Sequence, residues 1–137
     1  MSAMEARTVR PLRILLAEDN AVNQKVAINV LQKRGHTVTL AVNGREAVAL
    51  AASKTFDLIL MDIQMPEMDG YEATAAIREM EQTTGSHIPI IALTAHAMKS
   101  DEDRSIASGM DDFMAKPIHV TELIQKVEQF SRESSPV

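Results

Sequence analysis

Residues 56–70 read FDLILMDIQMPEMDG, and this stretch decides the fold. Its centre, Leu58 to Met61, is a short unbroken apolar run, which is typical of a strand buried on both faces of a sheet. The run stops at Asp62, and the turn-forming residues Pro66 and Asp69-Gly70 follow in one loop. The stretch therefore predicts a buried strand that ends in a loop.

The rest of the chain repeats this pattern of a short apolar strand followed by residues at helical spacing. Short runs predict strands at residues 12–17, 37–42, 56–63, 88–93 and 112–115. Apolar stripes at helical spacing follow them, at residues 22–31, 47–51, 71–80, 100–110 and 120–130. Sequential strands joined by helices must be parallel, and right-handed crossovers place helices on both faces of the sheet. The predicted class is α/β, a three-layer, doubly wound (βα)5 sandwich around a parallel five-stranded sheet.

The length and composition describe one ordinary domain. The chain has 137 residues, of which 45% are apolar and 24% charged, and this is enough to close one core. We expect the ordered domain at residues 11–131, between flexible polar tails at residues 1–10 and 132–137. The first tail lacks the apolar segment of a signal peptide, and no apolar run approaches the roughly 20 residues of a membrane span. A soluble, cytoplasmic protein is expected.

Charge and cysteine content narrow the possible functions. The formal net charge of -5 disfavours a sequence-independent hold on nucleic acid phosphates and suits the binding of small cations. The chain contains no cysteine, which removes disulfides, thiolate nucleophiles and zinc-thiolate sites together. Any chemistry must come from oxygen and nitrogen groups.

Polar side chains stand at the predicted carboxyl ends of four strands. They are Glu18 and Asp19 after the first strand, Asp62 after the third, Thr94 after the fourth and Lys116 after the fifth. Each could have only a local role, such as capping a helix or a turn. Open α/β sheets bind their ligands beyond the carboxyl ends of the strands, so the combination favours a functional site.

The three acids predict a metal site. Carboxylates held close together repel one another unless a cation lies among them. Oxygen ligands suit Mg²⁺, with Mn²⁺ as a substitute, and no nearby His-rich or thiolate set invites zinc. A phosphoryl group beside such a metal would find its charge neutralised, with Lys116 as a second cation and the Thr94 hydroxyl as a donor. Asp62 could then act as a nucleophile and form an aspartyl phosphate.

Other functions would use a similar fold. An aspartyl-nucleophile phosphatase or mutase would want a second acid two residues after Asp62, where Gln64 stands. A nucleotide or flavin carrier would want a glycine-rich loop after the first strand, where Glu18-Asp19-Asn20 would repel a phosphate unless a metal intervened. An interaction domain without phosphorylation would not need every chemical position to be filled, as it is here.

Four motifs carry a resemblance to a known family. They are Ile14 to Asn20, Leu60 to Gly70, Ile90 to Ala95 and Gly109 to Pro117. With these motifs in this order, residues 12–131 resemble a response-regulator receiver domain of two-component phosphorelay signalling. The resemblance implies a flavodoxin-like strand order, 2-1-3-4-5. It also implies a cis peptide bond between the lysine and the proline that end the last motif.

The resemblance also implies a role for each acid. Asp62 would accept a phosphoryl group from a phosphohistidine. Glu18 and Asp19 would hold Mg²⁺ together with Asp62 and the backbone carbonyl of Gln64. The domain would catalyse only its own phosphorylation and dephosphorylation, and it would switch conformation to regulate or relay a signal. It would not otherwise be an enzyme.

Further residues would contact or tune the phosphoryl group. By the resemblance, Lys116 and Thr94 would contact it, and Phe113 would turn inward together with Thr94 on activation. Simple packing against the fourth helix is an equally good interpretation of Phe113. Gln64 and His96 should flank the phosphoryl group and tune its lifetime, although a lone histidine in a loop is more often an exposed polar residue.

The wording of residues 17–24 and 65–70 resembles receivers of hybrid sensor histidine kinases more than receivers fused to DNA-binding domains. The chain would be either a single-domain regulator or a receiver from a longer protein. Its partners would be a histidine kinase and a histidine phosphotransfer domain, with the first helix as the docking surface by analogy. Nucleic acid and membrane contacts are not expected, and a monomer is favoured.

Overall fold

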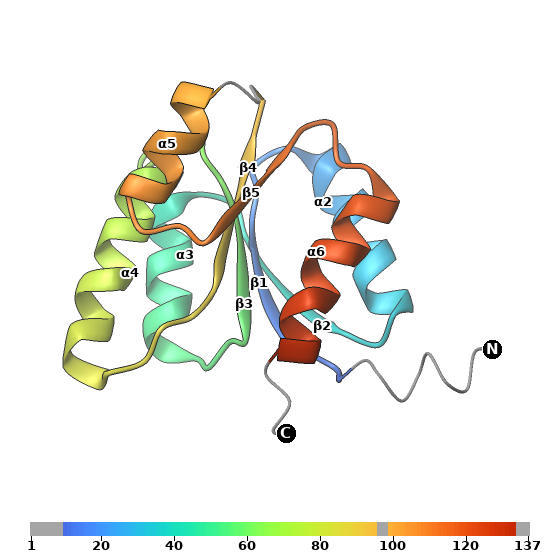
Figure 1. Cartoon of the computed structure of the whole chain (residues 1–137), viewed down its shortest axis with the longest axis horizontal. Helices are drawn as coiled ribbons and strands as arrows, with labels where there is room; N and C mark the ends of the chain where they lie inside the picture. Colours follow the sequence, from blue (N-terminus) through green and yellow to red (C-terminus); the bar gives the residue numbers. More distant parts are fainter. Residues whose placement is uncertain (1–9, 96–98, 134–137) are drawn as a thin grey trace.

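One parallel sheet forms the centre of the molecule (Figure 1). The computed structural model describes residues 10–95 and 99–133. Five strands pair in the order β2-β1-β3-β4-β5, and every neighbouring pair is parallel. Their bounds are Arg13–Ala17 for β1, Thr37–Ala41 for β2, Leu58–Asp62 for β3, Ile90–Thr94 for β4 and Asp112–Ala115 for β5. The α/β class and the strand order are confirmed.

Helices cover both faces of this sheet. They are α2 (Ala21–Lys33), α3 (Gly44–Ser53), α4 (Gly70–Thr84), α5 (Lys99–Ala107) and α6 (Val120–Glu133). Figure 1 shows α2 and α6 on one face and α3, α4 and α5 on the other, which makes three layers. Helix α6 continues past residue 131, where the sequence pattern places the end of the domain. Among the described helices, none is both long and apolar enough to cross a membrane.

The core consists of two apolar clusters separated by the sheet. Successive side chains of a strand point to opposite faces, and β3 shows this clearly because all of its residues are buried. Ile59 and Met61 pack in the cluster under α3 and α4. Leu58 and Leu60 pack in the cluster under α2 and α6. Each such side chain contributes about 1.5–3 kcal/mol when it is fully buried, so the central strand is held firmly from both sides.

Three strands begin later than their apolar runs suggest, β1 by one residue and β3 and β4 by two. β4 begins at Ile90 instead of residue 88, because Pro89 has no N–H to donate to a neighbouring strand. β3 begins at Leu58 instead of residue 56, because the Asp57 side chain turns back toward β1. Its Oδ2 accepts a hydrogen bond of 2.8 Å from the Arg13 backbone N–H. These later starts all lie at the end of the sheet away from the carboxyl ends of the strands.

Candidate functional site

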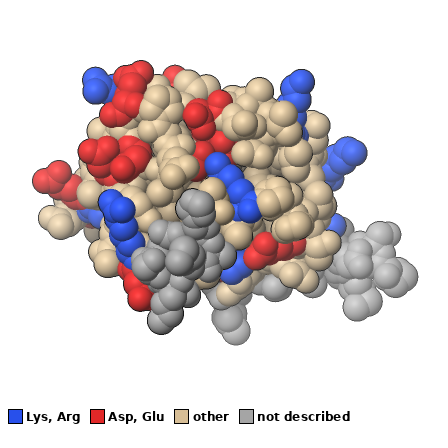
Figure 2. Space-filling view, turned by 90° about the horizontal axis from the view of Figure 1, so that it is seen from above, with Lys and Arg blue, Asp and Glu red and all other residues tan. Residues whose placement is uncertain are grey.

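Four strands bring polar side chains to one end of the sheet. Asp62 and Thr94 are the last residues of β3 and β4. Glu18 and Lys116 directly follow β1 and β5. Because these four strands are neighbours in the order β1-β3-β4-β5, the residues that end them lie side by side. Figure 2 looks onto this end and shows acidic and basic side chains adjoining near its centre.

Three carboxylates meet at this end. Oxygen atoms of Glu18, Asp19 and Asp62 all lie within 4.8 Å of one another. The Glu18 side chain has no exposed area and Asp62 is only 2% exposed, whereas Asp19 faces solvent. The buried oxygens Oε1 of Glu18 and Oδ2 of Asp62 both face the ammonium of Lys116. Three carboxylates beside one ammonium leave an excess of negative charge, and this arrangement fits a divalent cation such as Mg²⁺.

Lys116 supplies a positive charge to the two buried acids. Its Nζ lies 2.8 Å from Oδ2 of Asp62 and 3.4 Å from Oε1 of Glu18. Its backbone N–H donates a 2.7 Å hydrogen bond to the carbonyl of Thr94, which fixes the lysine beside the end of β4. Burial lowers the pKa of Lys116, but the hydrogen bond and charges of Asp62 and Glu18 outweigh it and the pKa is raised. The ammonium therefore stays charged.

Glu18 is the acid whose protonation is most strongly affected by its surroundings. Burial raises the pKa of Glu18 from 4.5 to about 7, and the nearby Asp62 adds to the rise. The backbone N–H of Asn20, 3.0 Å from Oε2, and the charge of Lys116 oppose it without cancelling it. A buried carboxylate with this pKa needs either a proton or a further cation near neutral pH.

Sequence reasoning missed the supports of Glu18. Asn20 is the N-cap of α2, where its side chain accepts a hydrogen bond from the Asn23 N–H, so its own N–H points back to Glu18. The side-chain amide of Gln24 donates a 2.7 Å hydrogen bond to the Glu18 carbonyl. The Asn20 N-cap was visible in the sequence pattern, but the reach of Gln24 back across one helical turn was not.

The loop after β3 orients Asp62. The backbone N–H of Gln64 donates a 3.1 Å hydrogen bond to Oδ1 of Asp62, while the Gln64 side chain is exposed. Gly70 begins α4, and its N–H donates a 2.8 Å hydrogen bond to the carbonyl of Ile63. A Cβ at Gly70 would lie 2.8 Å from Cα of Ile63 and would also meet the carbonyl of Asp62. Only glycine lets α4 start this close to the acid.

The same loop is fixed at its far end. Asp69 caps α4 by accepting a 2.8 Å hydrogen bond from the Glu72 N–H, and the Glu72 side chain accepts from the Asp69 N–H in return. Glu67 has a φ of 67°, which is a left-handed backbone conformation that a residue with a Cβ rarely adopts. The loop is therefore held in a defined shape and stores some backbone strain.

A solvent-open cleft of about 480 Å³ adjoins the acids. Its lining residues come from the start of α2, the β3–α4 loop, α4 and α5: Asp19, Ile63, Gln64, Met65, Asp69, Tyr71 and Arg104. The guanidinium carbon of Arg104 lies 4.2 Å from the centre of the Tyr71 ring. Sequence reasoning did not select either residue, because they lie on different helices and neither belongs to a motif at a strand end.

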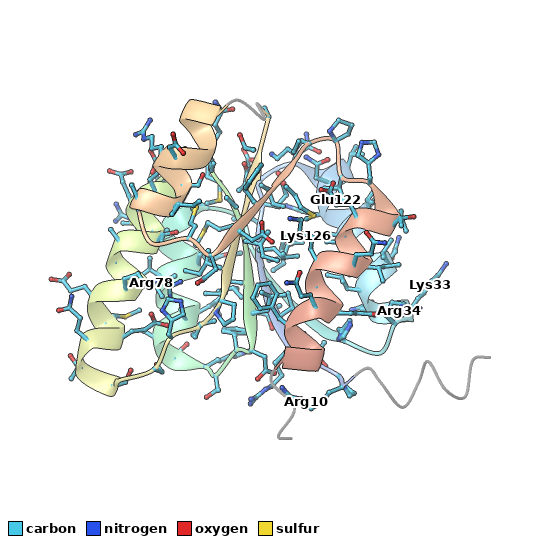
Figure 3. The ribbon with its side chains drawn as sticks, in the orientation of Figure 1. Arg10, Lys33, Arg34, Arg78, Glu122 and Lys126 are labelled. Carbon is cyan, nitrogen blue, oxygen red and sulfur yellow. The ribbon has the colours of Figure 1, made fainter. Side chains whose placement is uncertain are left out.

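The structure describes two of the remaining predicted residues, Thr94 and Phe113. Thr94 is 6% exposed at the end of β4. Phe113 is half-buried in β5 and packs against the cluster under α3 and α4. Lys126 reaches from α6 (Figure 3), and its Nζ lies 5.8 Å from the centre of the Phe113 ring. The Lys116–Pro117 peptide bond is cis, as the resemblance implies. His96 lies outside the described residues.

Comparison with known proteins agrees with this geometry. The family model of the response regulator receiver domain matches residues 14–128. Hybrid signal transduction histidine kinase I of Dictyostelium discoideum is 50% identical over 114 residues, which cover 80% of this chain. The match covers only 7% of that kinase, so the chain corresponds to a small part of its relative.

Solved structures show the same likeness. One is the receiver domain of the Saccharomyces cerevisiae response regulator Ssk1, crystallised with the histidine phosphotransfer protein Ypd1. It has a TM-score of 0.90 and 30% identity, and the match covers 94% of each chain. Another is the receiver domain of the sensor histidine kinase PA1611 of Pseudomonas aeruginosa, with a magnesium ion in its active site cleft. It has a TM-score of 0.79 and 42% identity, covering 91% of this chain and all (100%) of the other.

Proposed function

The chain belongs to the family of response regulator receiver domains, and on that premise we propose that Asp62 accepts a phosphoryl group from a phosphohistidine. The observation that carries the proposal is the position of Asp62. It is a buried carboxylate at the end of the central strand β3, 2.8 Å from a charged lysine and within 4.8 Å of two further acids. A carboxylate nucleophile in this position needs two cations beside it, the lysine and a metal ion.

We assign the metal to the acids at the strand ends. Glu18, Asp19 and Asp62 would hold Mg²⁺, with the backbone carbonyl of Gln64 as a further ligand and Mn²⁺ as a substitute. The meeting of three carboxylates beside a single ammonium supports this assignment. When bound, the metal would neutralise charge on the acids and on the phosphoryl oxygens.

The chain's own side chains account for the transfer. An oxygen of the Asp62 carboxylate attacks the phosphorus, the bond from phosphorus to the imidazole nitrogen breaks, and its electron pair stays on the imidazole. Lys116, which already contacts Oδ2 of Asp62, would move its ammonium toward a phosphoryl oxygen. The Thr94 hydroxyl would donate a hydrogen bond to another. The domain would thus catalyse only its own phosphorylation and, with water as the nucleophile, its dephosphorylation.

The phosphorylated state would be read out on the β4–β5 side. The new charge would draw in Thr94, and Phe113 would turn inward behind it. The half-buried position of Phe113 supports this role, since the ring has both a packed side and a free side. Gln64 and His96 would tune the lifetime of the acyl phosphate by steering or blocking water.

The proposed partners are a histidine kinase and a histidine phosphotransfer domain. Helix α2 begins next to Asp19, and its residue Val22 is 69% exposed. Val120, at the start of α6, is 47% exposed on the same face of the sheet. Exposed apolar side chains beside a charged site are typical of a protein docking surface. We assign this surface to the donor of the phosphoryl group.

Mass spectrometry of the intact chain tests the phosphoacceptor. The parent, Asp62→Asn and the control Asp57→Asn, whose acid lies at the opposite end of the sheet, are incubated with phosphoramidate with and without Mg²⁺. We expect one hydroxylamine-labile phosphoryl adduct on the parent and on Asp57→Asn, only with Mg²⁺, and none on Asp62→Asn. An adduct that persists in Asp62→Asn would contradict the assignment. No adduct on the parent, either here or from a phosphorylated phosphotransfer domain, would favour an interaction domain without the chemistry.

A further inference from the structure

The cleft that adjoins the acids is lined by a cation other than Lys116. Arg104 extends from α5 and is exposed, while Gln64 in the same cleft donates its backbone N–H to Asp62. The cleft is therefore lined both by a residue hydrogen-bonded to the nucleophile and by a guanidinium. Nothing in the phosphoacceptor mechanism above uses Arg104.

The ring of Tyr71 holds Arg104 in place. The guanidinium carbon lies 4.2 Å from the ring centre, which is a cation–π contact. An aromatic ring attracts the guanidinium without consuming its N–H donors, so these remain able to bind a planar anion. A guanidinium fixed in this way matches a carboxylate through two parallel hydrogen bonds.

The acids that line the cleft are engaged elsewhere. Asp69 accepts the Glu72 N–H as the N-cap of α4. Asp19 belongs to the acid cluster that is suited to a metal. Among the residues that line this cleft, Arg104 is the one with a positive charge to offer an incoming anion.

We propose that this cleft is the leaving-group subsite for acyl phosphates, with Arg104, held over Tyr71, binding the departing carboxylate. The inference rests on the proposed role of Asp62. In the reaction an Asp62 oxygen bonds to phosphorus, and the bond from phosphorus to the acyl oxygen breaks. The bonding pair goes to that oxygen, so a carboxylate leaves and no proton is needed. Because its negative charge grows as the bond breaks, Arg104 would stabilise the transition state more than the bound donor.

Two small donors separate this role from general damage. Acetyl phosphate releases acetate, which Arg104 can bind. Phosphoramidate releases an amine, which a guanidinium does not stabilise. The initial rate of adduct formation on the parent and on Arg104→Gln is measured for both donors with Mg²⁺. We expect Arg104→Gln to lower the rate with acetyl phosphate about 1.5- to fivefold, the range for an exposed charge pair, and to leave the rate with phosphoramidate unchanged.

Matched variants identify the cause. Arg13→Gln removes the same charge at the opposite end of the sheet, and it should keep the parent's ratio of the two rates. Tyr71→Phe keeps the ring and should keep the ratio, whereas Tyr71→Leu should shift it toward that of Arg104→Gln. The chain has one tyrosine and no tryptophan, so its intrinsic emission reports Tyr71 alone. Arg104→Gln should change this emission in the metal-free chain before any donor is added.

Each outcome is decisive. The subsite is supported if the ratio of the acetyl phosphate rate to the phosphoramidate rate falls in Arg104→Gln and Tyr71→Leu. The same ratio should keep the parent's value in the controls, Arg13→Gln and Tyr71→Phe. An unchanged ratio, an equal loss with both donors, or Tyr71 emission that is indifferent to Arg104→Gln overturns it while leaving Asp62 as the phosphoacceptor. If neither donor labels the parent, the proposed function has failed, and the subsite fails with it.

Discussion

Replacing Glu18 with glutamine should stabilise the metal-free protein at alkaline pH. The pKa of Glu18 is raised from 4.5 to about 7, so the folded chain binds this proton more tightly than the unfolded chain. An acid with a raised pKa contributes its full stability below pH 4.5 and loses it as the pH rises through 7. Glutamine keeps the shape and the neutral state at every pH. It therefore removes the penalty.

The magnitude follows from the shift. Each pKa unit corresponds to about 1.4 kcal/mol, so at pH 8 the charged Glu18 costs the metal-free fold about 3 kcal/mol. At pH 5 the same arithmetic leaves about 1 kcal/mol, because the folded acid is then protonated. Bound Mg²⁺ offsets most of this difference, since it adds about 2.7 kcal/mol to the parent at 100 times its dissociation constant. Glu18→Gln lacks one of the proposed metal ligands, so Mg²⁺ should add less to its free energy of unfolding.

Urea denaturation followed by far-ultraviolet circular dichroism measures these differences. The parent, Glu18→Gln and Glu79→Gln, an exposed acid on α4, are unfolded at pH 5 and pH 8, in EDTA and in Mg²⁺. In EDTA we expect Glu18→Gln to be more stable than the parent by about 3 kcal/mol at pH 8 and by about 1 kcal/mol at pH 5, and we expect Glu79→Gln to follow the parent throughout. A difference in free energy that is the same at both pH values would refute the reasoning, and so would a less stable Glu18→Gln in EDTA at pH 8.

Three further changes test other parts of the structure by the same unfolding assay. Gly70→Ala should lose at least about 2 kcal/mol, because its Cβ would press on the backbone of Asp62; an unchanged stability would contradict the close packing there. Glu67→Asn should gain about 1 kcal/mol, because asparagine tolerates its positive φ; a loss would show that the backbone is not strained. Burial lowers the pKa of His36, although Glu128 opposes this, so His36 contributes stability above its ordinary 6.5 that is lost as the pH falls below it. His36→Gln should reduce the fall in stability between pH 7 and pH 5.5, and an identical fall in both proteins would count against this.

The strands and their parallel direction could be predicted well because two simple rules determine them, whereas the strand order came from the family resemblance. Unbroken apolar runs mark buried parallel strands, and parallel strands bring their carboxyl ends to one edge of the sheet. Glu18, Asp62 and Lys116 each directly follow or end such a run, so their meeting was predictable without any tertiary information. The distances between them, which depend on side-chain rotamers, were not.

Contacts between helices could not be predicted in the same way. Arg104 and Tyr71 lie on α5 and α4, and their contact depends on how these helices are placed on the sheet. Lys126 and Phe113 meet for a similar reason, since α6 crosses beside β5. No periodicity within one segment carries this information. The start of β4 was misplaced for a local reason, because the apolar run includes Pro89, which has no N–H to donate to a neighbouring strand.

Lys116 also sets the net charge of the site. Its ammonium lies within 3.4 Å of two acids and stays charged. With Asp19 included, three ionised carboxylates and one ammonium leave an excess of negative charge that a single divalent cation would neutralise. A monovalent ion would neutralise only half of this excess negative charge, and a trivalent ion would leave the site positively charged. In the proposed metal site the lysine would therefore favour divalent ions by their charge, and a chain with a neutral residue at this position would favour ions of higher charge.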